Sequence, residues 1–337
     1  MDGGLITAFS TTLGFPRGGS NVAAGEAGAT LDQLATTAGE SAARTSMLVA
    51  RIDNDRCLPL LDKEAGVPRP TGSIFKLWVL GSLAEEIRAG RISPSAMVPF
   101  TNDEAVPGSA LNSTAPGTQI SIRDLANLML GISDNTSTDL LLELVGRDRA
   151  EQTLRTFGNR NRELMTPFLK VNEQFHVFWS LSPSLATEYA AAGDEEQRAI
   201  LTNSIEPLGP VTAFPQSNQV ALYDSSWTAS AYDVCQAYAG LRKFDNRSDE
   251  FKIIEESAGA EVALLSVRNR WDRVWQKGGS LANNDGNYVF TLSWMFESDA
   301  KGAFVVVIMA SNRDGTPVDS SSLFSVAARA EQIVFNR

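Results

Sequence analysis

The stretch RPTGSIFKLWVLGSLAEEI, residues 69–87, carries one ammonium group, Lys76, inside an apolar run that begins after Ser73. The stretch predicts a helix from about Ser73 to Ala89. Its apolar residues leave no polar stripe wide enough to carry a lysine into water, so we expect this helix to be buried. A buried amine loses solvation and its pKa falls, and the first turn of a helix also disfavours a cation. The lysine is therefore badly placed for stability and needs another explanation.

Ser73 lies one helical turn before Lys76 and offers such an explanation. Residues at i and i+3 share a helix face, so a hydroxyl and a neutral amine meet there as nucleophile and base without a histidine. The S-x-x-K spacing is weak evidence by itself. Ser73 is equally explained as a helix N-cap, and the stem of Lys76 is long enough to carry its amine to the surface. The same spacing recurs at Ser298 and Lys301, where it predicts a polar surface turn between two strands.

Composition and charge limit the partners of the chain. Its 337 residues suffice for one large domain or two small ones and for a substantial core. The net charge of −11 disfavours nucleic acid and anionic membrane surfaces, and no stretch is apolar enough to span a membrane. A small-molecule substrate and a monomer or dimer are expected. The first residues do not form an intact signal peptide, so the protein is cytoplasmic, or periplasmic or secreted after a signal was removed.

The order of predicted elements indicates the fold class. Two strands, at 46–53 and 57–62, precede a long helical middle, and three strands with a closing helix follow it. We predict an α/β (α+β) fold with a five-stranded antiparallel sheet, built from both chain ends and flanked by helices, beside an all-helical lobe. The predicted division is an N-terminal extension with a helix (1–40) and one domain (41–337), with the helical lobe at about 65–245. The cleft between sheet and lobe is the expected site.

Cysteine and histidine usage argues against a metal or cofactor. The two cysteines, Cys57 and Cys235, are predicted to be free buried thiols rather than a disulfide. The single histidine, His176, lies in the apolar context EQFHVFW and is predicted to be a packed side chain. One histidine and two cysteines cannot build a zinc site of the usual kinds, so no metal or cofactor is predicted.

Two further motifs give Ser73 and Lys76 their context. S-D-N occurs once, at 133–135, at a predicted helix start, and K-G-G-S occurs once, at 277–280, on a predicted strand. S-x-x-K, S-D-N and K-T-G together are the signature of class A β-lactamases and penicillin-binding proteins, and this chain has the three elements in that order, with K-G-G in place of K-T-G. From about residue 40 to residue 337 the sequence resembles this family of serine hydrolases. Its neighbouring stretches, such as PFLKVNEQF and SSWTASAYDVC, resemble a subgroup that includes a β-lactamase-like protein of clavulanic acid biosynthesis.

The resemblance implies an acyl-enzyme mechanism with assigned roles. A serine attacks an activated carbonyl, a lysine accepts its proton, and a second serine, helped by a second lysine, relays a proton to the leaving nitrogen. Backbone N–H groups form an oxyanion hole. The implied catalytic residues are Ser73, Lys76, Ser133 and Lys277, and the implied substrate-binding residues are Asn135, Gly279 and Ser280. Each motif also has a structural reading, as a helix cap at Ser133 or Asp134 and as a bulged strand at 277–280.

Three departures from the family pattern leave the reaction open. Gly278 replaces a hydroxyl that would hold a substrate carboxylate, with Ser280 as its possible substitute. The water-activating pattern E-x-x-L-N is missing from 155–185, where Glu163 and Glu173 either activate water or, as we favour, are surface carboxylates. The Pro-rich stretch 207–226 predicts an extra loop that walls or covers the cleft. The leading function is hydrolysis of β-lactams or related amides. The alternatives are an esterase or peptidase-like acyl transferase, and a penicillin-binding protein without fast turnover.

Overall fold

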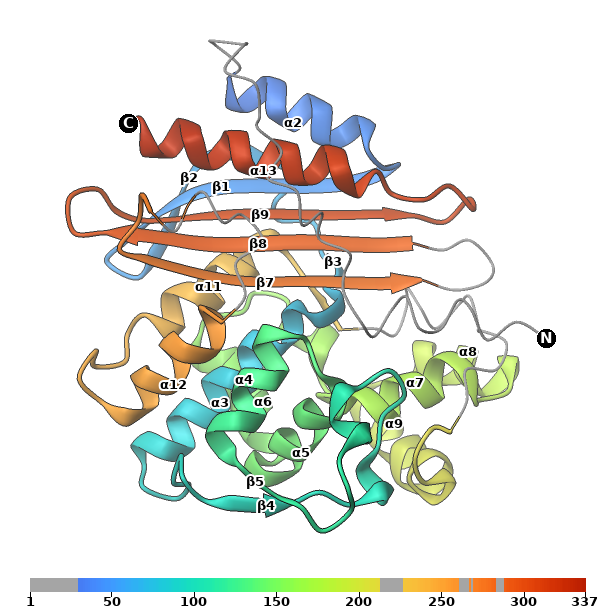
Figure 1. Ribbon diagram of the computed structural model, residues 1–337. Helices are drawn as coiled ribbons and strands as arrows, with labels where there is room; N and C mark the ends of the chain where they lie inside the picture. The colour runs from blue at the N-terminus through green and yellow to red at the C-terminus, as the bar shows by residue number, and fades with distance from the viewer. Residues whose placement is uncertain (1–29, 213–226, 261–266, 268, 283–287) are drawn as a thin grey trace.

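A five-stranded antiparallel sheet crosses the molecule, and it contains strands from both the N-terminal and the C-terminal part of the chain (Figure 1). In this computed structural model, the described residues are 30–212, 227–260, 267, 269–282 and 288–337. The pairing of an N-terminal with a C-terminal strand is seen where Leu48 lies opposite Val307. The strands run in the order β2 (Arg56–Lys63), β1 (Arg44–Asp53), β9 (Gly302–Asn312), β8 (Tyr288–Ser298) and β7 (Arg273–Ala282).

The central strands are apolar because both faces of the sheet are covered. In β9 every residue from Ala303 to Asn312 is buried, which explains its continuous run of valine and isoleucine. The edge strand β2 alternates and is largely exposed. The β1–β2 connection is a two-residue turn in which Asn54 and Asp55 have positive φ angles of 44° and 61°, the conformation that hairpin turns of this length favour.

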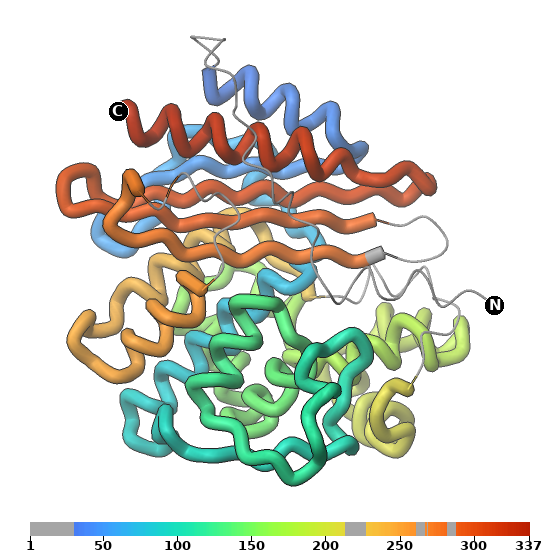
Figure 2. The backbone as a smooth tube through the Cα atoms, viewed as in Figure 1, coloured from blue at the N-terminus to red at the C-terminus, as the bar shows by residue number. Residues whose placement is uncertain are grey.

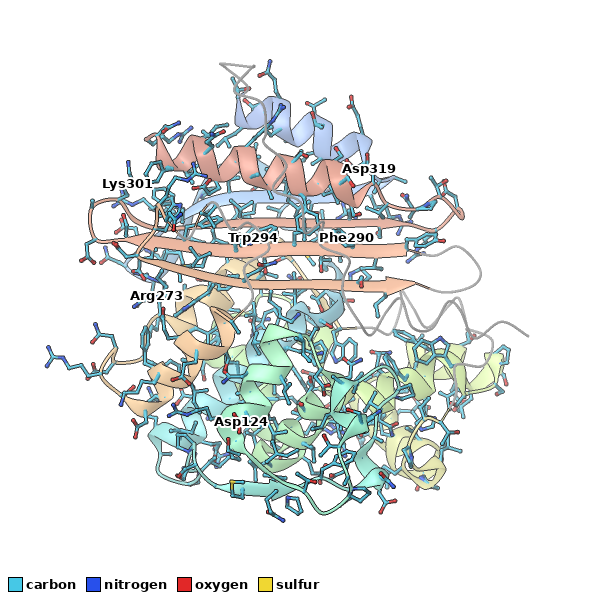
Figure 3. The ribbon with its side chains drawn as sticks, viewed as in Figure 1. Asp124, Arg273, Phe290, Trp294, Lys301 and Asp319 are labelled. Atoms are coloured by element: carbon cyan, nitrogen blue, oxygen red, sulfur yellow. A yellow bond between two sulfur atoms is a disulfide. The ribbon has the colours of Figure 1, made fainter. Side chains whose placement is uncertain are left out.

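Two helices cover the outer face of the sheet, namely α2 (Leu31–Glu40) and α13 (Ser320–Phe335). Thr30 and Gln33 form a capping box at the start of α2. On the sheet, Phe290 and Trp294 of β8 lie beneath α13 (Figure 3), where both pack edge-on against Phe324. These contacts belong to a separate apolar core between the sheet and the two helices.

The helical layer packs on the opposite face and contains the buried helix that the sequence predicted. In α3 every residue from Lys76 to Ala84 is buried, so that this helix runs through the centre of the layer (Figure 2). Two short ribbons join the layer, β3 (Arg69–Pro70) with β6 (Thr228–Ala229), and β4 (Met97–Pro99) with β5 (Gln119–Ser121). The helices are α3 (Lys76–Arg88), α4 (Ile122–Gly131), α5 (Asn135–Val145), α6 (Arg147–Thr156), α7 (Val171–Trp179), α8 (Pro183–Ala191), α9 (Asp194–Ile200), α11 (Ala231–Leu241) and α12 (Asp249–Ala258).

The predicted fold class is confirmed, and the sheet has the predicted strands in one layer. The domain boundaries at 40/41 and the limits of the helical lobe stay predictions. The predicted loop at 207–226 lies mostly outside the described residues, which end at 212 and resume at 227. Within the part of the chain that the structure describes, no helix has the length and apolar character needed to cross a membrane.

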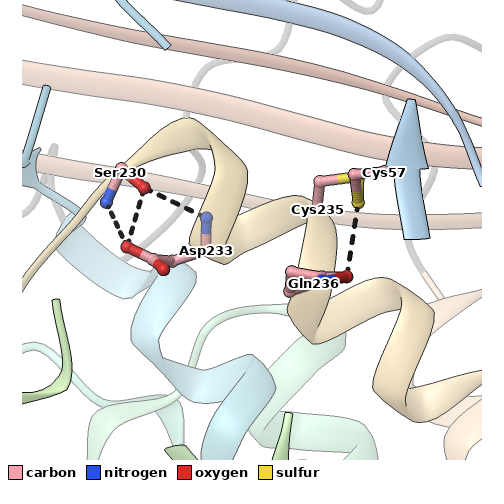
Figure 4. Close-up of a disulfide and its surroundings, with 5 residues drawn as sticks. All are labelled: Cys57, Ser230, Asp233, Cys235 and Gln236. Carbon is pink, nitrogen blue, oxygen red and sulfur yellow. Dashed lines mark hydrogen bonds between the residues drawn. A yellow bond between two sulfur atoms is a disulfide. The ribbon is translucent and has the colours of Figure 1, made fainter. Parts of the chain in front are cut away.

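The prediction of free thiols is wrong, because Cys57 and Cys235 form a disulfide (Figure 4). Their Cα atoms are 6.3 Å apart, within the usual range for such a bond. The two residues are 178 positions apart in the chain, and only the packing of α11 against the sheet beside β2 brings them together. The disulfide therefore ties the sheet edge to the helix that follows β6.

Candidate active site

Lys76 lies at the start of α3 with its side chain fully buried. Its Nζ donates hydrogen bonds to the carbonyl oxygen of Ser133 (2.6 Å) and to Oδ1 of Asn135 (2.8 Å), and lies 3.3 Å from Oγ of Ser133. Burial lowers the pKa of this amine well below its ordinary value, and the nearby positive charge of Lys277 lowers it further. A lysine in this state is able to accept a proton near neutral pH.

Ser133 is held between the two lysines of the site. Its Oγ accepts a hydrogen bond from Nζ of Lys277 at 3.0 Å and lies 3.3 Å from Nζ of Lys76. Its φ angle is +62°, an uncommon backbone conformation for a residue with a side chain. Ser133 is therefore not the helix cap, a role that belongs to Asp134, whose carboxylate accepts the N–H of Ser137 (2.8 Å).

Ser73 sits inside a 3-10 turn, Gly72–Phe75, that leads into α3. The predicted helix therefore begins in a tighter turn than expected, and Ser73 is not its N-cap. Among the residues that the structure describes, the Ser73 hydroxyl makes no hydrogen bond with Lys76, whose amine is turned towards Ser133 and Asn135. Catalytic hydrogen bonds are often long without substrate and shorten when it binds.

Two glycines let the strand β7 approach the serine turn closely. A Cβ atom on Gly279 would lie 2.4 Å from the backbone N of Ser73, and one on Gly72 would lie 2.9 Å from the backbone N of Ser280. No side chain fits at either position without a backbone shift. The backbone N atoms of Ser73 and Ser280 therefore both lie where β7 meets the serine turn. Gly278 contributes its carbonyl oxygen, which accepts from Nζ of Lys277 at 2.7 Å.

Residues that belong to none of the sequence motifs connect β7 and β8 to the serine turn. Thr291 of β8 donates through its hydroxyl to the carbonyl oxygen of Thr71 (2.8 Å), and Thr71 donates its N–H to the carbonyl oxygen of Trp227 (2.8 Å). The ring of Phe75 stacks on Trp227, with centroids 3.9 Å apart and planes 5° from parallel. These contacts join segments more than 150 positions apart, so no local signal in the sequence pointed to them.

Asp139 is a second group that the sequence analysis missed. It lies one turn after Asn135 on α5, and its carboxylate accepts the N–H groups of Val171 (2.6 Å) and Asn172 (2.8 Å). Burial raises the pKa of Asp139 to about 7 despite these two hydrogen bonds. Asp139 therefore connects the helix of the S-D-N motif to the first turn of α7. Its position four residues after Asn135 was the available signal.

The two glutamates considered as water activators lie in different environments. Glu163 is exposed, as favoured from the sequence. Glu173 is buried, so its interpretation as a surface carboxylate is wrong. Its two oxygens accept from the Arg147 guanidinium (2.6 Å) and from the backbone N–H of Lys170 (2.7 Å).

His176 is a packed histidine, as predicted from its apolar context. It lies on α7 at 4% exposure, with Nδ1 2.8 Å from Oγ of Ser180 and Nε2 2.8 Å from the carbonyl oxygen of Gly209. The carbonyl oxygen accepts from Nε2, so Nδ1 accepts from the serine hydroxyl. Within the described ranges, no group of three or more histidine, cysteine, aspartate or glutamate side chains is placed to hold a metal ion.

Comparison with known proteins identifies the family. A family described as the beta-lactamase enzyme family matches residues 29–198, half of the chain. The chain belongs to this family. It is a hydrolase of the β-lactamase type, and its small-molecule substrate class follows from the family. A comparison with curated proteins finds no match.

Solved structures confirm the class A β-lactamase-like fold. A β-lactamase from Chitinophaga pinensis is 16% identical, with a TM-score of 0.59, and the match covers 90% of this chain and 97% of that one. A β-lactamase from Francisella tularensis is 10% identical, with a TM-score of 0.62 and coverages of 91% and 100%. A PBP-A mutant in an acyl-enzyme complex with penicillin G is 14% identical, with a TM-score of 0.59 and coverages of 91% and 98%. The subgroup suggested by the sequence stays a prediction.

Proposed function

We propose that the protein is a serine hydrolase that forms an acyl-enzyme on Ser73, with β-lactams or related amides as its substrates. The observation that carries this proposal is the position of the Ser133 hydroxyl between the amines of Lys76 (3.3 Å) and Lys277 (3.0 Å). Two lysines and a serine in contact are costly for stability, since each amine lowers the proton affinity of the other. Catalysis that needs a neutral amine and a proton relay explains that cost.

The proposed acylation uses the residues assigned from the three motifs. The hydroxyl of Ser73 attacks the substrate carbonyl carbon, and its proton passes to the neutral amine of Lys76. The backbone N–H groups of Ser73 and Ser280 stabilise the oxyanion. The hydroxyl of Ser133 gives a proton to the leaving nitrogen, and Lys277 replaces that proton. Asn135 is proposed to hold the amide side chain of the substrate once Lys76 releases its oxygen, and Gly279 permits the close approach of β7.

A second candidate is a penicillin-binding protein that acylates without fast turnover. The environment of Glu173 favours it, because an arginine and a backbone N–H already occupy both oxygens of that carboxylate. Glu163 is exposed, and in the described part of the chain its carboxylate forms no hydrogen bond or ion pair with a motif residue. The PBP-A neighbour was solved as an acyl-enzyme complex with penicillin G, which supports a stable acyl-enzyme on this fold. An esterase or acyl transferase is the remaining alternative, because esters need less help at the leaving group.

One experiment separates these candidates. The protein is mixed in turn with nitrocefin, a penicillin and p-nitrophenyl acetate, and turnover and intact mass are followed together. Steady lactam hydrolysis supports the leading function, a stable adduct without turnover supports the penicillin-binding candidate, and ester turnover alone supports the esterase.

Matched serine variants test the assignment of the nucleophile. Ser73→Ala is expected to abolish both adduct and turnover, whereas Ser298→Ala, at the other S-x-x-K, keeps them. Full activity of Ser73→Ala on every substrate would overturn the proposed mechanism.

A further inference from the structure

A hollow where β1 begins and β2 ends gathers positive charge, and none of the motif residues lines it. Its volume is about 480 Å³. Its wall combines the end of α2, the first residues of β1, the end of β2 and the approach to β3. The charged residues that line it are Arg44, Lys63, Glu64 and Arg69.

These charges do not balance inside the hollow. Arg69 is buried at 8% exposure and is neutralised by Glu64, whose Oε2 lies 2.5 Å from its guanidinium. Nζ of Lys63 donates to the carbonyl oxygen of Ala35 at 2.8 Å, which is a neutral acceptor. Arg44 is exposed and, in the part of the chain that the structure describes, has neither an ion pair nor a hydrogen bond from its side chain. Three cations therefore face one carboxylate.

This surplus is unusual in a chain with a net charge of −11. Burial is the larger cause that lowers the pKa of Arg69, and repulsion by Arg44 lowers it further. Each of the two engaged cations has a structural task, since Arg69 also donates to Ser46 (2.6 Å) and Lys63 donates to the carbonyl oxygen of Ala35 in the middle of α2. Those tasks explain Arg69 and Lys63, but not the placement of Arg44 beside them.

The carboxylate of Glu64 shows where an anion can contact the Arg69 guanidinium. Its φ angle is +49°, in the left-handed region that a glutamate adopts at a cost. This backbone conformation accompanies a half-exposed carboxylate that rests on the buried guanidinium of Arg69. An external oxyanion would find the same guanidinium, with Arg44 and Lys63 as additional donors of charge-assisted hydrogen bonds.

We infer that this hollow, between Arg44, Lys63 and Arg69, is a binding site for a small oxyanion, a phosphate or carboxylate group, separate from the residues of the three motifs. Arg44 supplies the unpaired charge, Arg69 supplies the fixed guanidinium, and Glu64 competes for it. The residues that follow Arg69 lead directly to the serine turn, so a bound ligand braces the segment that carries Ser73.

Titration calorimetry of the full chain at low ionic strength tests this site with two probes, inorganic phosphate and malonate, and with chloride as the control for ionic strength. We expect saturable binding of one equivalent of at least one oxyanion. Tighter binding of phosphate indicates a phosphate ligand, and tighter binding of malonate indicates a carboxylate ligand. Arg44→Gln should weaken binding about fivefold, the effect of removing one unit charge about 4 Å from the anion when water screens the pair as in bulk solvent. Glu64→Gln should strengthen it by removing the competing carboxylate.

Arg51→Gln is the matched control, because Arg51 is an exposed arginine on the same strand and does not line the hollow. It should leave the affinity within about twofold of the wild type, since a single distant surface charge is screened by solvent. The inference is overturned if neither probe binds, or if Arg44→Gln and Arg51→Gln have the same affinity, which would place the anion elsewhere. Circular dichroism confirms that the three exposed substitutions leave the fold intact.

Discussion

Two S-x-x-K stretches in this chain have the same spacing and opposite surroundings. At 73–76, the lysine is fully buried and its amine contacts the Ser133 carbonyl and Asn135. At 298–301, the stretch turns between β8 and β9, and Lys301 lies over the ring of Phe335, 5.0 Å from its centroid. At 73–76, burial lowers the pKa of the motif lysine, and a second lysine, Lys277, contacts the Ser133 hydroxyl that also faces Lys76. The lysine at 298–301 is only partly buried, and among the described residues no second lysine contacts the serine of that stretch.

The comparison separates two ways in which a cation is accommodated. Lys301 keeps solvent access and gains an aromatic face, which is a mild stabilisation. Lys76 loses its solvent, and the hydrogen-bond acceptors around it do not restore the ordinary pKa. A protein keeps such a group at a cost in stability, as is common for residues of an active site.

The largest difference between the two S-x-x-K stretches is expected when each lysine is replaced in turn. Lys76→Met is expected to lower kcat/KM about 10²–10⁴-fold, the usual contribution of a positioned general base, while Lys301→Met leaves it unchanged. Steady-state or single-turnover acylation with the best of the three test substrates measures both. Equal activity of the two variants would remove Lys76 from the mechanism, and circular dichroism excludes unfolding as the cause of a loss.

The next largest difference, in stability and acylation rate, is expected between alanine substitutions at two glycines, Gly279 and Gly302. Gly279→Ala places a Cβ 2.4 Å from the N of Ser73 and 2.5 Å from the carbonyl oxygen of Thr71, so backbone must move. We expect a loss of about 1–3 kcal/mol in the free energy of unfolding, as for overpacked sites, together with slower acylation. Gly302→Ala, at φ +80° beside Lys301 and with nothing within 4 Å of its Cβ, should cost about 1–2 kcal/mol through backbone strain alone and spare activity.

Urea denaturation and acylation rates measured on the same samples distinguish the two glycine variants. If Gly279→Ala acylated at the wild-type rate, the close approach of β7 to Ser73 would have no part in the reaction. A lower rate with Gly302→Ala would instead show that loss of stability alone slows acylation.

Much of the fold followed from the sequence, because its signals are local. The apolar runs of β8 and β9 and the buried face of α3 each span a few turns or a single strand, and their order sufficed for the sheet and its helical partner. The disulfide between Cys57 and Cys235 did not follow, because it depends on how α11 packs against the sheet beside β2. Glu173 was misplaced for the same reason, since its partner Arg147 lies on another helix.

The motif residues were predictable for a different reason. Ser73, Ser133 and Lys277 each stand in a short pattern, and the structure brings the last two into contact around Lys76. The residues that join the motifs, Thr71 and Thr291, belong to no pattern. Their role arises from the approach of two distant segments, which is a property of the folded chain.

The pH dependence of acylation sharpens the contrast between the lysines. In the proposed mechanism Lys76 acts as the neutral amine, so the rate should rise with pH through its lowered pKa and reach a plateau well below the ordinary pKa of a lysine. Lys277→Met removes a charge that lowers this pKa, so the rising limb should move to higher pH. Lys301→Met should leave the profile in place. A rising limb at the same pH in Lys277→Met and in the wild type would contradict the coupling of the two amines.

The smallest effect is expected at Lys301 itself, and it concerns stability. Lys301→Met keeps most of the aliphatic stem but removes the charge above Phe335, so the free energy of unfolding should fall by about 0.5–1 kcal/mol, the value for an exposed cation over a ring. Urea denaturation of Lys301→Met, with Phe335→Leu and the double variant, gives the coupling between the two side chains. A coupling free energy near zero would mean that the contact with Phe335 does not stabilise Lys301. The two S-x-x-K stretches would then differ in the burial of their lysines, and the aromatic contact of Lys301 would not add to that difference.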